Sequence, residues 1–240
     1  MRPSAAPAGT APPDRRPHLE SYTPARALRR EPTLNEPTRD RRSITTRKIT
    51  RTDFDRVTDT LARAFDDDPV MNYLVKQDAR RAERLRRLMR MALNPMTFPY
   101  GETYVAERFE GVALWNPPGQ LMHGLVANLR MLPLMAQIAG LSGLPRALGA
   151  LGLMEAKHPK EPHYYLLAIG VDPAMQGRGV GSQLMAPMLE RCDREHMPAY
   201  LESSKARNVP LYERHGFEVV EELPIARGGP LAWRMWRKPR

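Results

Sequence analysis

The chain has 240 residues, of which 42% are hydrophobic and 27% charged, and its formal net charge is +10. Its single cysteine, Cys192, excludes an intramolecular disulfide bond and a metal site made of several cysteines, and we expect no bound metal. The sequence shows no secretory signal pattern and no run of about 20 apolar residues, so we expect a cytoplasmic protein that does not enter a membrane. Cys192 falls in a predicted helix and is expected to act as a small buried hydrophobe.

Residues 1–42 differ in composition from the rest of the chain. They hold eight prolines, and their nine arginines against five acidic residues give a net charge of +4. Such a segment buries too little apolar surface to offset chain entropy, so we predict disorder over 1–42 and one folded domain over 43–240. An over-long translation start is the alternative. A basic arm can bind nucleic acid, but the chain lacks helix-turn-helix, RRM and zinc-finger signatures, and we expect no nucleic-acid partner.

The first elements of the folded part follow from apolar spacing. They are a strand at 43–49, a helix at 53–65 and a helix at 78–93. Asp53 is the expected N-cap of the first helix. The run from Asp66 to Asp68, followed by Pro69, is predicted to end that helix as a solvated loop, with attraction of a cationic substrate as the alternative. The seven basic residues within 76–90 recur at helical spacing and are predicted to form a solvated helix face.

Two short strands, at 103–107 and 112–115, are predicted to pair as a hairpin. The next segment, 121–156, is apolar and helix-prone, from Leu121–Met131 onward, with several glycine and proline breaks. We predict a helical insertion-like flap, and a packed helical or dimer surface is the alternative; a monomer and a homodimer both stay open. After the flap, strands and helices alternate at 163–171, 179–195, 198–203, 208–215, 217–222 and 230–237.

The most informative motif follows the strand at 163–171. The sequence Gln176-Gly177-Arg178-Gly179-Val180-Gly181 lies between a turn and an amphipathic segment, 182–194. Glycines allow positive φ angles and close approach of a ligand, and a helix start offers unpaired N–H groups and a positive dipole end to an anion. This order of strand, turn and helix predicts a pyrophosphate site. Its spacing fits neither the Rossmann fingerprint nor the P-loop.

The motif resembles the acyl-CoA loop of the GNAT superfamily of N-acetyltransferases. Val171-Asp172-Pro173 precedes the loop at the spacing of that family. The segment from Asn208 to Phe217 follows it and resembles the family's Asn…Tyr-x-x-x-Gly-Phe element. The three features together make the resemblance specific.

Further segments resemble the puromycin N-acetyltransferase branch of that superfamily. They are 158–162, 199–204 and 207–214, in which Tyr212 follows Asn208 by four positions. The likeness is nearly unbroken over 158–238, looser over 44–120 and absent before residue 43.

The resemblance implies an α/β (α+β) fold: a single GNAT-type domain with a central mixed, mostly antiparallel sheet flanked by helices. It implies acetyl-CoA as co-substrate and direct acetyl transfer to the primary amine of a small molecule, such as a puromycin-like antibiotic. The residues implied to bind CoA are Ile169, Gly170, Val171 and Asn208 for the pantetheine arm, Tyr212 beside the sulfur, and Gln176, Gly177, Arg178, Gly179, Val180, Gly181 and Ser182 for the pyrophosphate. An exposed, solubilising role is the alternative for Arg178.

Acyl transfer to an amine needs a neutral amine, a stabilised oxyanion and a proton for the leaving thiolate. The resemblance places Tyr212 beside the CoA sulfur as general acid; a core tyrosine packed on Phe217 is the alternative. Glu202, near the end of its strand, is the candidate general base, directly or through water, with a salt bridge as the alternative. Asn208 is expected to cap the short helix and to reach the pantetheine arm. His215 is expected to lie at the surface.

Two other function classes stay open. A protein lysine or N-terminal acetyltransferase would need an open groove, whereas the long apolar segment 121–156 favours a small, enclosed acceptor. A CoA-binding regulatory protein without turnover would not need Tyr212, which is present.

Overall fold

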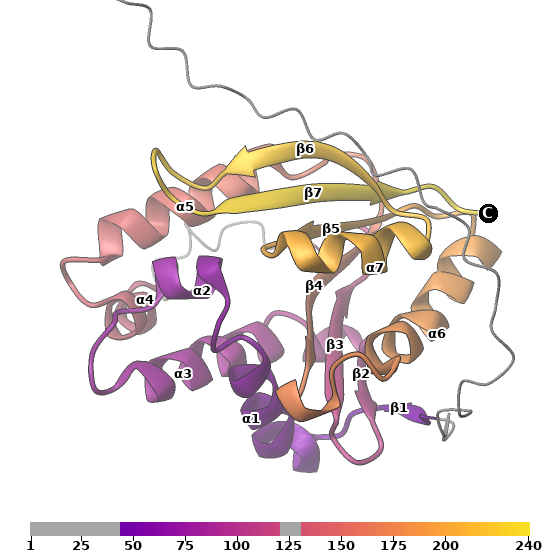
Figure 1. Cartoon of the computed structure of the whole chain (residues 1–240), viewed down its shortest axis with the longest axis horizontal. Coiled ribbons are helices and arrows are strands. Elements are labelled where there is room, and N and C mark those ends of the chain that lie inside the picture. Colours follow the sequence, from indigo (N-terminus) through magenta and orange to yellow (C-terminus); the bar gives the residue numbers. More distant parts are fainter. Residues whose placement is uncertain (1–43, 121–130) are drawn as a thin grey trace, which may run out of the picture. The chain divides into compact units, whose positions relative to one another are not determined.

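A seven-stranded sheet organises the protein, whose computed structural model describes residues 44–120 and 131–240 (Figure 1). The predicted disorder over 1–42 and the predicted helical stretch Leu121–Met131 lie outside these ranges, except for the last residue of that stretch. The strands are ordered β1-β2-β3-β4-β5-β7-β6. They are β1 (Thr46–Lys48), β2 (Thr103–Ala106), β3 (Gly111–Asn116), β4 (Tyr164–Val171), β5 (Ala199–Ser203), β6 (Glu218–Pro224) and β7 (Leu231–Arg237).

One neighbouring pair of strands, β4 and β5, is parallel, and the other five pairs are antiparallel. The mixed, mostly antiparallel sheet expected from the sequence is therefore confirmed. The parallel pair is short: only Tyr164–Leu166 pairs with Ala199–Leu201. The rest of β4, Leu167–Val171, has no strand partner on the β5 side within the described part of the chain. The two central strands therefore separate after the third of the eight residues of β4.

The separation begins next to a β-bulge in β4. Leu114 of β3 pairs with Ala168, whereas the next residue, Trp115, pairs with Leu166. Leu167 is therefore an extra residue on β4, and such a bulge bends a strand and increases its local twist. The bulge accounts for the divergence of β4 from β5 directly after Leu166.

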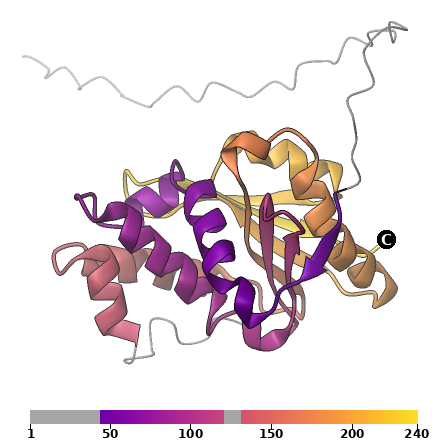
Figure 2. The same ribbon diagram turned by 90° about the horizontal axis from the view of Figure 1, so that it is seen from below.

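Helices cover both faces of the sheet, and Figure 1 shows α1 and α6 on opposite sides of β3 and β4. The helices are α1 (Phe54–Ala64), α2 (Pro69–Leu74), α3 (Arg81–Leu93), α4 (Leu132–Ala139), α5 (Leu144–Lys157), α6 (Val180–Arg194) and α7 (Val209–Arg214). The buried side chains form two clusters, one packed under α1 to α5 and the other under α6 and α7. Figure 2 shows α1 and α3 side by side. The two clusters make the sheet the middle layer of three.

Helix α2 was not predicted. Asp68 was expected to belong to a solvated loop, but it is only 1% exposed. Its Oδ1 accepts hydrogen bonds from the backbone N–H groups of Val70 and Met71, both at 2.9 Å, and Pro69 occupies the first turn. An aspartate N-cap followed by proline is a helix start. The prediction of a solvated loop is therefore wrong for Asp68.

Asp53 stands at the N-cap position of α1, as predicted, but its side chain does not cap the helix. Its two carboxylate oxygens accept hydrogen bonds from Arg47 at 2.7 and 2.8 Å, and one also accepts from the Thr50 N–H at 2.8 Å. A bidentate bond to a guanidinium is stronger than a neutral cap, and it lowers the pKa of Asp53. The carboxylate therefore fastens β1 to the start of α1.

The arginines of α3 lie on a largely exposed face, as predicted, and they also form ion pairs there. Arg86 Nε lies 2.6 Å from Asp59 Oδ1, and Arg90 Nη1 lies 3.0 Å from Asp55 Oδ1, so α3 is linked to α1. The side chains of Arg86 and Arg90 stay 44% and 41% exposed. Each such pair contributes up to about 1 kcal/mol. They position α3 on α1 more than they stabilise the fold.

Cys192 lies on α6 with no exposed surface, which confirms its predicted role as a small buried hydrophobe. Burial raises the pKa of Cys192 to about 12, so its thiol stays protonated and unreactive. Among the helices in residues 44–120 and 131–240, none is long and apolar enough to cross a membrane.

Candidate active site

The glycine-rich loop lies exposed at the start of α6. Gly177 and Gly179 have φ angles of +74° and +85°, and a Cβ atom on either would meet no atom within 4 Å. Their conformation, and not crowding, therefore favours glycine. Gly181 is buried, and its Cβ position lies 3.4 Å from Leu211 of α7. Gly179 is the N-cap of a helix of 15 residues, so exposed backbone leads directly into unpaired helical N–H groups, an arrangement that suits an anion.

Three polar side chains of this loop differ in their surroundings. Gln176 Nε2 donates to the Val171 carbonyl at 3.2 Å and ties the loop to the end of β4. Arg178 is exposed. The hydroxyl of Ser182 lies 2.9 Å from Nε2 of His215, which stands at the end of α7 as predicted but is half-buried. Burial and three nearby arginines lower the pKa of His215, which leaves it neutral beside Ser182.

The free side of β4 adds backbone groups to the site. Ile169, Gly170 and Val171 all lie beyond Leu166, where β4 has left β5. At Gly170 a Cβ atom would lie 2.8 Å from the Ala64 Cβ, so α1 closes one face of this stretch. The edge toward β5 keeps backbone donors and acceptors that no described strand pairs. An extended ligand can pair with such an edge as an added strand does.

Tyr212 lies on α7 with 5% of its surface exposed, and its ring meets Phe217 edge-on at a centroid distance of 6.2 Å. Its hydroxyl makes no hydrogen bond to any of the described residues. Burial raises the pKa of Tyr212, and the charge of Asp68 raises it further. The phenol is therefore protonated at neutral pH and can donate a proton. Packing against Phe217 and the predicted general-acid role are compatible.

Asn208 stands at the N-cap position of α7, and Pro210 lies in the first turn as predicted. The Asn208 side chain makes no capping hydrogen bond, so that prediction is wrong. The backbone around Asn208 is already helical, with φ −90° and ψ −19°, which is not the extended geometry of a side-chain cap. The half-buried amide is therefore not used by the helix itself.

Glu202 lies on β5, where the sheet begins to open, and 6% of its side chain is exposed. Two phenols donate to its carboxylate, Tyr165 to Oε2 at 2.7 Å and Tyr200 to Oε1 at 2.8 Å. Burial raises the pKa of Glu202, while these hydrogen bonds and the charge of Arg234 lower it in part. A raised pKa suits a carboxylate that takes a proton from an ammonium group. The predicted salt-bridge alternative is not the main interaction.

Glu202 and Tyr212 flank the opening from opposite faces of the sheet. Leu201 packs in the cluster under α6 and α7, which also contains Tyr212. Because side chains alternate along a strand, the next residue, Glu202, points to the other face, toward His158 at the end of α5. The structure thus separates the candidate base from the candidate acid by the width of the sheet.

The acidic run after α1 reaches across this opening. Asp67 pairs with Lys205, and with Arg207 at 2.8 Å, while Asp68 accepts a hydrogen bond from the hydroxyl of Ser204. These contacts join the α1–α2 connection to the β5–α7 connection. The run is therefore tied to the protein and is not a loop that only faces solvent.

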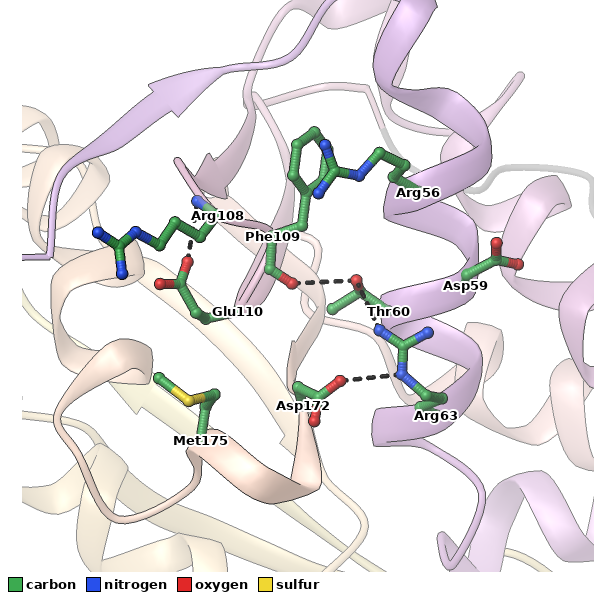
Figure 3. Close-up of a pocket in the computed structure, with 9 residues that line it drawn as sticks. All are labelled: Arg56, Asp59, Thr60, Arg63, Arg108, Phe109, Glu110, Asp172 and Met175. Atoms are coloured by element: carbon green, nitrogen blue, oxygen red, sulfur yellow. Dashed lines mark hydrogen bonds and ion pairs between the residues drawn. The ribbon is translucent and has the colours of Figure 1, made fainter.

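A cavity of about 260 Å³ lies elsewhere, between α1, the β2–β3 turn and the start of the β4–α6 connection (Figure 3). In it, Arg63 and Asp172 point toward each other at 2.9 Å, and the Arg56 guanidinium stacks 3.8 Å from the centre of the Phe109 ring. Its lining holds three arginines and three acidic residues. It contains neither Glu202 nor Tyr212, and its balanced charge selects no ligand class.

Sequence reasoning missed four side chains around Glu202: His158, His163, Tyr165 and Tyr200. The rings of His158 and Tyr165 meet edge-on at 4.7 Å, and those of His158 and Tyr200 at 4.9 Å. Their positions in the chain give no common pattern, because they come from the end of α5, a loop and two strands.

Comparisons with known proteins agree with this geometry. Residues 138–217 match the model of the "Acetyltransferase (GNAT) family". A Schizosaccharomyces pombe protein named as an uncharacterized N-acetyltransferase is 29% identical over 193 residues, covering 75% of this chain and 77% of that protein.

Two solved structures share the fold. One is described as "histone acetyltransferase HPA2 and related acetyltransferase" from Corynebacterium glutamicum; it has a TM-score of 0.62 and 27% identity, over 82% of this chain and 96% of that one. The other is a mosquito arylalkylamine N-acetyltransferase-like protein, with a TM-score of 0.56 and 16% identity, over 82% of this chain and all of that one. The chain is thus similar to GNAT acetyltransferases in one third of its sequence, residues 138–217, and in its fold.

Proposed function

We propose that this protein is an acetyl-CoA-dependent N-acetyltransferase that acetylates the primary amine of a small molecule by direct attack. One observation carries the proposal: the opening between β4 and β5 is bordered by an exposed glycine-rich loop and flanked by Tyr212 and Glu202. When bound, acetyl-CoA supplies a thioester-activated acetyl group. Residues 176–182 would hold its pyrophosphate, and Ile169–Val171 would pair with the pantetheine amides.

The proton transfers assign one role to each side chain. Glu202 takes a proton from the acceptor ammonium, so that the amine nitrogen gains the lone pair it needs for attack. Tyr212 donates its hydroxyl proton to the departing sulfur. As the nitrogen bonds to the acetyl carbon, it loses a second proton. This proton returns to the Tyr212 phenolate. One proton is released in total, and it leaves from Glu202.

The acceptor side supports a small substrate. Helices α4 and α5 pack against α3 and α2, and the backbone N–H of Lys76 donates to the Ile138 carbonyl at 3.0 Å. Because small molecules bind in enclosed, mostly apolar sites, a covering layer of helices favours a small acceptor over a protein. The resemblance of residues 158–238 to the puromycin N-acetyltransferase branch supports an antibiotic-detoxifying role in the cytoplasm. A protein acetyltransferase is the second candidate, because one similar structure is described as a histone acetyltransferase.

The test measures thiol release from acetyl-CoA with a panel of amines that includes puromycin and a lysine-containing peptide. We expect turnover with a small amine that is lost in Tyr212→Phe while CoA binding persists. Turnover of the peptide alone would support the protein acetyltransferase. CoA binding without any turnover would overturn the proposal in favour of a regulatory protein.

A further inference from the structure

Two histidines lie beside Glu202 and have no role in the reaction as described. His158 follows the last residue of α5, and His163 precedes β4. Their Nε2 atoms are 3.0 Å apart. His163 is 3% exposed, and the His158 side chain is 11% exposed. His163 is therefore buried, whereas solvent reaches His158.

The hydrogen bonds determine where each proton lies. His163 Nδ1 is 2.6 Å from the carbonyl oxygen of Glu161. A carbonyl oxygen only accepts, so this Nδ1 carries the hydrogen. Burial lowers the pKa of His163, which keeps the ring neutral, and its Nε2 is then an acceptor. His158 Nε2 must donate to it. In neutral His158 the Nδ1 atom is consequently the basic nitrogen, and it faces Glu202 Oε1 at 3.8 Å.

The other groups around Glu202 do not accept its proton. Tyr165 and Tyr200 both donate to the carboxylate, and burial raises the pKa of each phenol. Arg234 Nε donates to the Tyr200 hydroxyl at 2.9 Å. Its Nη1 pairs with Glu221, which also binds Lys157 at 2.8 Å. Of the described groups that face Glu202, His158 Nδ1 is therefore the base.

We propose that His158, held in this tautomer by His163, carries the acceptor's proton from Glu202 to solvent. The inference rests on the proposed function. An N–H bond of the ammonium breaks as an O–H bond forms on Glu202. That O–H bond then breaks as His158 Nδ1–H forms, a step that requires the two atoms to close from 3.8 Å to hydrogen-bond distance. The resulting imidazolium keeps its Nε2–H on His163 and loses the new proton to water. Both histidines act through Glu202 and are positioning residues.

Variants of the pair separate this relay from simple packing. His158→Gln keeps a donor toward His163 but cannot shuttle a proton, so kcat should fall by about 10- to 100-fold near neutral pH, with KM for both substrates within about two-fold. Adding imidazole to the buffer should restore part of this rate. His163→Leu removes the acceptor and should match His158→Gln, whereas His163→Gln keeps a donor and an acceptor and should recover most of the rate lost in His163→Leu.

The control is His196→Asn. His196 is exposed at a φ angle of +50°, a conformation that asparagine tolerates, and it should keep the wild-type rate. An unchanged kcat in His158→Gln, in a protein that acetylates an amine, would overturn the relay and leave the proposed function standing.

A second measurement needs no turnover. In ¹⁵N NMR spectra of the free protein, His163 should show a hydrogen on Nδ1 and none on Nε2. Glu202→Gln removes the facing carboxylate and should lower the titration midpoint of His158 by about 1 pH unit. The opposite His163 tautomer, or an unchanged midpoint, would overturn the relay. The expected spectra without turnover of any amine would instead contradict the proposed function.

Discussion

The hydroxyl of Ser204 donates a hydrogen bond to Asp68, a residue 136 positions earlier in the chain. The same carboxylate caps α2 through two backbone N–H groups, and its charge raises the pKa of Tyr212. One buried aspartate thus links the α1–α2 connection, the β5–α7 connection and the candidate acid. A side chain with several partners fixes the relative positions of the elements it joins.

Asp68→Ala should destabilise the protein by about 1–2 kcal/mol, because it removes the cap of α2 and leaves buried donors without an acceptor. Asp66→Ala is the matched control: the Asp66 side chain is 65% exposed, and its pairing with Arg81 contributes up to about 1 kcal/mol. Urea denaturation of both variants gives the two free energies of unfolding. Equal losses would contradict the role assigned to Asp68.

Gly177→Ala and Gly179→Ala should weaken CoA binding about tenfold, since each forces a side-chain-bearing residue into a left-handed conformation that costs about 1–2 kcal/mol. Isothermal titration calorimetry with CoA measures the change. Gly228→Ala is the control, because Gly228 also has a positive φ angle, +70°, and open space around its Cβ position, but lies in the β6–β7 turn. Gly228→Ala should lower the free energy of unfolding by a similar amount and bind CoA with the wild-type affinity. A loss of CoA affinity in Gly228→Ala would show that backbone strain anywhere in the protein weakens binding.

Tyr212→Phe should lower kcat by about 100-fold or more, because it removes the proton for the leaving sulfur and little else. Tyr164→Phe is a suitable comparison: Tyr164 is also buried, but its hydroxyl donates to Glu195 at 2.6 Å, within the α6 region. Steady-state kinetics with saturating acetyl-CoA give kcat for both variants, Tyr212→Phe and Tyr164→Phe. Full activity in Tyr212→Phe would remove this residue from the mechanism.

The rate should depend on the ionisation of Glu202. The base must be charged, and burial raises the pKa of Glu202 above its ordinary value of 4.5, so kcat/KM should fall as the pH drops through that raised pKa. The contribution of Glu202 to the free energy of unfolding changes with pH in the opposite direction. A carboxyl whose pKa is raised on folding contributes stability below its unfolded pKa, and this contribution is lost as pH rises through the folded pKa. Glu202→Gln should abolish both dependences, and an unchanged acid limb in this variant would assign it to another group.

The parts of the fold that follow local rules were predicted from the sequence. The strand before the glycine-rich loop, the loop itself and α6 are recognisable because apolar runs, glycines and an amphipathic segment succeed one another along the chain. Helix α2 was missed because Asp66 to Pro69 both ends one helix and begins the next. The same aspartates that stop a helix also cap one.

The side chains that surround Glu202, the candidate base, could not be predicted from the sequence. Tyr165 and Tyr200 meet Glu202 only because β4 and β5 pair in parallel with one particular register. The bulge at Leu167 is equally a property of strand pairing and not of a residue type. Asp53 and Asn208 show the reverse case: each stands at the predicted N-cap position, but neither side chain caps its helix, because Arg47 binds Asp53 and the backbone at Asn208 is helical.

The divergence of β4 from β5 has a thermodynamic consequence. Unpaired N–H and C=O groups in the middle of a sheet must be satisfied by water or by a ligand. A molecule that lies along Leu167–Val171 would complete the sheet only in the folded state, so the melting temperature should rise with its concentration. At 100 times the dissociation constant the gain is about 2.7 kcal/mol. The melting temperature would therefore measure how much ligand is bound in the gap between β4 and β5.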